Sequence, residues 1–207
     1  MSRNLILISL LISFAVGIFA YTRKSADGFT VLLVPHNHIF QPKIMEFMDR
    51  QYHPNIKNII ILGTNHADAG PVILKSDDDY SIQNIVPVVK KMYPTANIMP
   101  YIFRPGHDLL QTLSFSEDIK KIYHPDNTVI IASVDFSHYT SLSQADVFDQ
   151  ETITALRNRD YNQLITWGPE HTDCPDCLIV SSNLGDSFSL TGREYLDGTS
   201  YIFGIFR

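Results

Sequence analysis

The sequence predicts an α/β fold with a buried, mostly parallel sheet. Three short apolar runs rich in β-branched residues, at 31–34, 59–62 and 129–132, are each bounded by turn residues, as buried parallel strands are. Helical patterns fall between these runs. With 207 residues, the chain is long enough for one substantial core even after an apolar leader is set aside. We therefore expect a single domain over residues 25–207.

The individual elements follow from apolar periodicity and from prolines that stop helices. Pro54, Pro94 and Pro125 each lie a few residues after a helical pattern, where they mark its end. The last segment, 199–206, alternates small or polar residues with large ones for part of its length, as a final or edge strand does. In chain order, the expected elements are strand 29–34, helix 41–51, strand 58–63, a loop to about 79, helix 80–92, strand 97–103, helix 108–123, strand 127–134, helix 144–157, a short helix near 160–166, helix 175–184, and strands near 187–191 and 200–206.

An almost uninterrupted apolar segment, Leu5–Ala20, lies near the start of the sequence. It follows Arg3 and fits the core of a signal peptide or a short membrane anchor better than a helix of the domain. We expect residues 1–24 to anchor the protein in a membrane or to direct its export, with an uncleaved anchor preferred. Arg23 and Lys24 oppose Arg3 under the positive-inside rule, so both orientations stay open.

The charge balance argues against nucleic acid as a partner. The chain has 16 Lys and Arg residues against 22 Asp and Glu residues, which gives a formal net charge of −6. No basic stripe interrupts this balance, whereas nucleic-acid-binding domains carry a positive patch.

Each of the three apolar runs leads into a side chain that can bind a metal. The first leads to His36, the second to His66, and the third to Asp135 and His138. Because ligands bind outside the carboxyl ends of parallel strands, we expect these groups to converge. Two imidazoles and one carboxylate form the facial triad of non-haem Fe(II) enzymes, and zinc accepts the same set. The alternative is that the two histidines satisfy backbone groups where strands turn into loops.

A second chemical feature is the C-x-x-C segment formed by Cys174 and Cys177, with Pro175 between them. At the start of a helix, such a pair can exchange thiols and disulfides, because the helix N-terminus lowers the pKa of the first thiol. Cys174 could instead ligate the metal as a lone thiolate. The third alternative is a disulfide or a pair of inert thiols, which fits an exported domain best.

Several segments occur in the order seen in one known family. They are Val34-Pro35-His36, Ile61-Leu62-Gly63-Thr64-Asn65-His66, Ser133-Val134-Asp135-Phe136-Ser137-His138-Tyr139, the Cys174 segment, and Ser200-Tyr201-Ile202-Phe203-Gly204. On these segments, the chain from about residue 30 to its C-terminus resembles the Memo-like family, also called AmmeMemoRadiSam system protein B. The resemblance implies a three-layer α/β/α fold similar to that of class III extradiol dioxygenases, with a central sheet flanked by helices.

The resemblance also implies a metal pocket. His36, His66 and Cys174 match the family's ligand positions, and Asp135 and His138 match its pocket-lining residues. Radical-SAM and AMMECR-type proteins are the partners that the family grouping suggests.

Two departures from the family pattern bear on catalysis. The family usually follows its first histidine with Ala-Gly-Tyr, where this chain has Asn37-His38-Ile39. It usually carries Glu-His-Ser-Ile-Glu, where this chain has Asp79-Tyr80-Ser81-Ile82-Gln83. The second segment loses a histidine and a carboxylate, so the acid–base capacity of the pocket is reduced.

Three functions follow as hypotheses. The first is an iron- or copper-dependent enzyme, with zinc as a further candidate metal, that carries out redox or oxygen-linked chemistry on a small molecule. In it, Asp135 adds a ligand or orients one, and His138 donates or accepts a proton. The second is a membrane-tethered binding module that keeps the pocket but has lost turnover. The third is thiol–disulfide exchange through Cys174 and Cys177.

Overall fold

The computed structural model describes residues 28–68, 70–104 and 108–207. The expected leader, residues 1–24, lies outside these residues. Among the helices that are described, none combines the length and the apolar character needed to cross a membrane.

A mostly parallel sheet forms the centre of the domain, which confirms the predicted α/β class. Within the described residues, seven strands form one sheet in the order β3-β4-β2-β5-β1-β7-β6. The inner strands β4, β2, β5 and β1 pair in parallel, whereas β3 at one edge and β7 and β6 at the other pair antiparallel. The strands are β1 (Thr30–Val34), β2 (Asn58–Thr64), β3 (Ile73–Leu74), β4 (Asn97–Phe103), β5 (Thr128–Ser133), β6 (Phe188–Leu196) and β7 (Thr199–Phe206).

The central strands are apolar throughout because both faces of the sheet are covered. Ile131 of β5 pairs with Leu32 of β1 and with Ile61 of β2, and the three side chains lie in one core layer. The next residues along the strands, such as Ala132 and Leu62, pack into the layer on the opposite face. This alternation of sides fixes the register, since a slip by one residue would exchange the two core layers.

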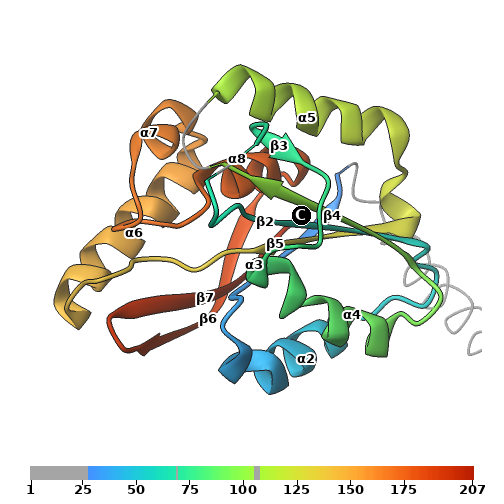
Figure 1. The fold of residues 1–207 in the computed structure, drawn as a ribbon, viewed down its shortest axis with the longest axis horizontal. Coiled ribbons are helices and arrows are strands. Elements are labelled where there is room, and N and C mark those ends of the chain that lie inside the picture. The colour runs from blue at the N-terminus through green and yellow to red at the C-terminus, as the bar shows by residue number, and fades with distance from the viewer. Residues whose placement is uncertain (1–27, 69, 105–107) are drawn as a thin grey trace, which may run out of the picture.

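Helices cover both faces of the sheet (Figure 1). The apolar side chains of α2, α3 and α4 pack in one core layer, and those of α5, α6, α7 and α8 pack in the other. The helices are α2 (Gln41–Asp49), α3 (Tyr80–Gln83), α4 (Val86–Met92), α5 (Leu109–Ile122), α6 (Leu142–Asn158), α7 (Tyr161–Thr166) and α8 (Pro175–Leu184), with short 3-10 turns η1 (His38–Phe40) and η2 (Pro125–Asn127).

Three expected elements differ in detail. The helix predicted over 80–92 is two helices, α3 and α4, because Pro87 lies in the first turn of α4 and has no N–H to continue the earlier helix. The expected loop before residue 79 contains the short edge strand β3. Strand β6 extends five residues past the expected end at 191, and a bulge between Leu190 and Gly192 interrupts its pairing with β7.

Gly63 lets α3 lie directly on the carboxyl end of β2. A Cβ atom at this position would lie 2.4 Å from Ser81 Oγ and 2.9 Å from Ile82 Cδ1. Both neighbours are fully buried, so neither can move away without cost. Glycine is therefore required here for close packing.

Gly63→Ala should lower the free energy of unfolding by about 1–3 kcal/mol, because overpacking displaces α3. Denaturant unfolding measures the loss. Gly192→Ala is the matched control, since a Cβ there would meet only Phe203 atoms at 3.8 Å. A Gly63→Ala variant as stable as the parent would contradict this packing.

Candidate metal site

Three parallel strands deliver polar side chains to one edge of the sheet. His36 lies two residues past the end of β1, His66 two past β2, and Asp135 two past β5. Because β5 lies between β1 and β2, the three strand ends are neighbours. The rings of His36 and His66 lie 5.3 Å apart between centroids, and Asp135 Oδ2 lies 3.3 Å from His36 Nε2.

Asp173 completes the cluster. Its Oδ2 atom lies 3.3 Å from His36 Nε2 and 3.7 Å from His66 Nε2. One ligand atom from each of these three residues lies within 4.8 Å of the other two, close enough for all three to hold one metal ion. Asp173 Oδ2 is buried and has no hydrogen-bond partner within the described residues. Such an orphaned carboxylate oxygen fits a site for a cation, because a buried acceptor without a partner is costly.

Hydrogen bonds turn both imidazoles so that Nε2 faces Asp173. His36 Nδ1 lies 3.4 Å from the carbonyl oxygen of Ser133, and His66 Nδ1 lies 2.9 Å from Asp79 Oδ1. Both oxygens only accept hydrogen bonds, so each Nδ1 carries the proton and donates it. Each Nε2 then keeps its lone pair for a metal, the arrangement typical of metal-binding histidines.

The two carboxyl groups are oriented by backbone N–H groups. The amide of His36 donates to Asp135 Oδ1 at 3.0 Å, and the amide of Asp135 donates to Asp173 Oδ1 at 3.1 Å. Each side chain therefore presents Oδ2 to His36 Nε2 at 3.3 Å. Asp135 therefore lies beside the three-residue cluster, against His36.

Burial makes the cluster reluctant to carry charge without a cation. It raises the pKa of Asp135 to about 7. Burial, reinforced by the nearby charge of Asp135, raises the pKa of Asp173 well above its usual value. Burial and then the neighbouring His66 lower the pKa of His36 to about 3, so this imidazole is neutral at physiological pH. A neutral imidazole and carboxyls that exchange protons for a cation are what a metal site requires.

Asp79 differs from the two carboxyl groups of the cluster. Burial acts to raise its pKa, but hydrogen bonds from His66 and Ser81 outweigh this effect and lower it to about 2. Its Oδ1 accepts from His66 Nδ1 and from the amide of Ser81, and its Oδ2 accepts from the amide of His66 at 3.0 Å. This ionised carboxylate holds the backbone and the ring of His66 together.

A pocket of about 380 Å³ opens beside the cluster and contains His138 in its wall. Burial lowers the pKa of His138, and its Nδ1 atom is buried without a hydrogen-bond partner in the described part of the chain. A neutral imidazole in this position can accept a proton from a bound molecule. The pocket is lined by Thr64, Asn65, His66, Asp68, Tyr80, His138, Tyr139, Trp167, Gly168, Pro169, Thr172 and Asp173.

The expected thiolate ligand is not present. Cys174 forms a disulfide with Cys177, the third alternative for this segment, and so offers no thiolate. The two residues stand at the start of α8 with their Cα atoms 5.3 Å apart, a spacing that a disulfide spans. Asp173, the residue before Cys174, contributes its carboxylate to the cluster instead.

Sequence reasoning missed Asp173 because its place depends on contacts that are distant in the chain. The amide of Asp173 donates to the carbonyl of Asp135, and Thr64 Oγ1 donates to the carbonyl of Asp173 at 3.1 Å. A short antiparallel bridge between Phe136 and Thr172 brings the two segments together. The available signal was an acidic residue directly before a predicted helix start.

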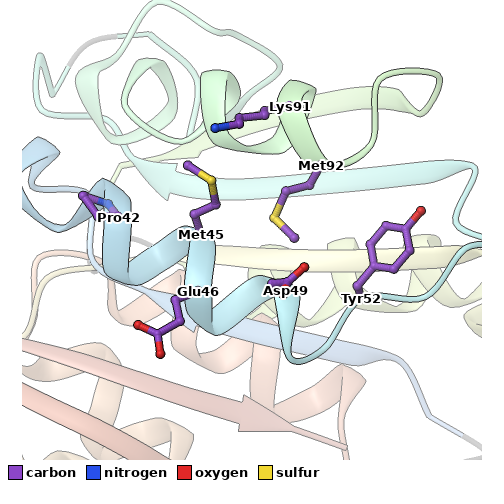
Figure 2. A pocket seen from close by; sticks show the side chains of 7 residues that line it. All are labelled: Pro42, Met45, Glu46, Asp49, Tyr52, Lys91 and Met92. Atoms are coloured by element: carbon purple, nitrogen blue, oxygen red, sulfur yellow. The ribbon is translucent and has the colours of Figure 1, made fainter.

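A second hollow lies between α2 and α4, away from the cluster. Met45 of α2 and Met92 of α4 point into it, and Tyr52 closes one end (Figure 2). Its volume, about 570 Å³, exceeds that of the pocket at the strand ends. Its walls contain neither histidine nor cysteine, so its size alone does not make it a metal or catalytic site.

In the metal-free protein, Asp135 should lower the free energy of unfolding as the pH rises from about 4 to about 7, whereas His36, whose pKa is lowered to about 3, raises it over much of the same range. Because the two contributions oppose each other, that of Asp135 is measured as the difference between the parent and Asp135→Asn. The pKa of Asp135 is raised from 3.8 to about 7. Over this range the unfolded chain gives up a proton that the fold retains. The decrease in the free energy of unfolding that Asp135 causes is absent below about pH 4 and complete above about pH 7. It amounts to at most about 4 kcal/mol, at 1.4 kcal/mol per pKa unit.

Denaturant unfolding at a series of pH values, after treatment with a chelator, measures this dependence. Relative to the parent, Asp135→Asn should gain stability as the pH rises through this range. An unchanged slope in that variant would show that this carboxyl is not the group responsible.

Similarity to known proteins is found among solved structures. No protein-family model matches the sequence, and no curated protein matches it either. Among solved structures, the chain is similar to the crystal structure of the uncharacterized protein JW3007 from Escherichia coli K12. The match has 12% sequence identity and a TM-score of 0.49, and it covers 86% of this chain and 98% of the other.

Proposed function

We propose that the chain is a Memo-like metal-binding protein that carries out iron- or copper-dependent redox chemistry on a small molecule. The observation that carries this proposal is the buried Oδ2 atom of Asp173, which lies without a hydrogen-bond partner in the described structure between the Nε2 atoms of His36 and His66. The order of the sequence segments and the parallel sheet between two helical layers support the relation to Memo-like proteins and class III extradiol dioxygenases. By the same resemblance, radical-SAM and AMMECR-type proteins are the proposed partners.

The donor set fits a divalent transition metal. His36, His66 and Asp173 would hold the ion, and Asp135, which lies against His36, would add a ligand or orient one. Two imidazoles with a carboxylate suit Fe(II), and the same donors accept copper or zinc. An iron or copper ion would supply one-electron chemistry and polarise a bound oxygen atom. The residues of the chain would contribute the pocket and, in its wall, the His138 imidazole as a group that can accept a proton.

A binding module without turnover is the second candidate. Tyr80 and Gln83 stand where Memo-like proteins usually have histidine and glutamate, and Gln83 is exposed. His138 is then the one imidazole that lines the described pocket without belonging to the three-residue cluster. This thinned set of acid–base groups favours binding over catalysis.

The full chain, purified without oxygen, should contain about one metal ion per protein by elemental analysis. His66→Ala and Asp173→Ala should each abolish stoichiometric metal, because each removes a ligand atom. His124→Ala is the matched control, since His124 is an exposed histidine outside the cluster. Full metal content in Asp173→Ala would refute the proposed ligand set.

Asp79→Ala should weaken metal binding by about 10–100-fold without removing a ligand, because second-sphere carboxylates orient metal-binding histidines. Competition with a chelator of known affinity measures the change. An affinity equal to that of the parent would mean that His66 is oriented without Asp79.

Oxygen uptake separates the enzyme from the binding module. The iron-loaded parent, supplied with a chemical reductant, should consume oxygen in a metal-dependent manner if the pocket is catalytic. Uptake that is present only after combining Tyr80→His with Gln83→Glu would identify the parent as a binding module. The comparison uses equal metal loading in both proteins.

A further inference from the structure

Tyr80 touches both imidazoles of the cluster. Its ring stacks on His66 with 3.9 Å between centroids and an interplanar angle of 27°. The same ring meets His36 edge-on at 5.2 Å and 71°. The cluster described above therefore has an aromatic side chain against each of its histidines.

The position of this ring is set by a fixed backbone. Tyr80 is the first residue of α3 and directly follows Asp79, whose side chain is hydrogen-bonded to His66. Ser81 is fully buried, and its hydroxyl donates to the carbonyl of Thr64 at 3.0 Å. These contacts anchor the residues on either side of Tyr80, so the position of its Cα atom is fixed.

The ring of Tyr80 lies against the cluster and is partly open to solvent. It is 49% exposed, although a phenol ring gains free energy from burial, and it lines the pocket together with His66 and Asp173. His66 retains 26% exposure of its side chain with the ring stacked on it. Removing the ring would uncover this imidazole further and leave its orientation to the hydrogen bond with Asp79.

We propose that Tyr80 is a positioning residue that controls how fast a metal ion enters and leaves. Its ring holds the His66 imidazole in the coordinating orientation and covers the solvent side of the ion, so exchange requires the ring to move. This inference rests on the proposed metal site. It concerns the aromatic face of Tyr80 and not its hydroxyl group.

Tyr139 supplies a matched control. It is also an aromatic residue of the same pocket, and it is 90% exposed. Its ring contact among the described residues is with His138, at 5.8 Å, and not with either histidine of the cluster. Truncating Tyr139 alters the pocket wall but leaves the cover over His66 in place.

The experiment follows the release of Co(II) from the full chain into excess chelator by the loss of its visible absorbance. Tyr80→Ala should release the ion faster on the order of tenfold, the lower end of the range for residues that orient metal ligands. Tyr80→Phe keeps the ring and should stay within about twofold of the parent, as should Tyr139→Ala. Because Tyr80 is half exposed, the thermal unfolding of Tyr80→Ala should remain close to that of the parent.

The outcomes separate this inference from the proposed function. Stoichiometric Co(II) in the parent with unchanged release from Tyr80→Ala would overturn the role of Tyr80 and leave the metal site intact. Equally fast release from Tyr80→Phe and Tyr80→Ala would assign the effect to the hydroxyl and also overturn it. A parent that binds no Co(II), Fe(II), Cu(II) or Zn(II) would overturn the metal site and this inference together.

Discussion

The parallel pairing of β5 with both β1 and β2 is the constraint on which the candidate site depends. Parallel strands end at the same edge, so this pairing places the loops that carry His36, His66 and Asp135 beside one another. The pairing itself depends on apolar residues that fill both core layers. Stability and site assembly therefore have the same origin, and a change that alters the register of β5 would separate the site residues as well as the core.

The second level of organisation is a set of backbone amides and carboxylates that fix the polar groups at this edge. Asp135 accepts from the amide of His36, and Asp173 accepts from the amide of Asp135. Asp79, the residue before α3, accepts from both the amide and the ring of His66. Each member of the site thus uses one atom for support and leaves another facing the common centre, as His36, His66, Asp135 and Asp173 all do. No lysine or arginine side chain pairs with the buried carboxyls of Asp135 and Asp173 within the described residues, so the arrangement suits a metal ion.

Local sequence pattern was sufficient for the fold class and most elements, because strands such as β5 carry a continuous apolar run and helices such as α2 carry an apolar face within a few residues. It also indicated the strand ends at which His36 and His66 lie. It could not place Asp173, whose position depends on a bridge between segments about 36 residues apart. The ligand role given to Cys174 came from family resemblance, which has no information on whether this chain pairs that sulfur with Cys177. The break between α3 and α4 was visible in principle at Pro87.

The disulfide at the start of α8 has a consequence for the residue that precedes it. It closes a loop of sequence separation three, so its effect on the entropy of the whole unfolded chain is smaller than that of a long-range crosslink. Its effect on its own turn is larger, because it prevents the first turn of α8 from fraying. Asp173 is attached to that turn, and its carboxylate is therefore ordered during folding and not at the moment of ligand binding. The disulfide contacts no ligand, yet it thus reduces the loss of conformational entropy that ligand binding would otherwise require.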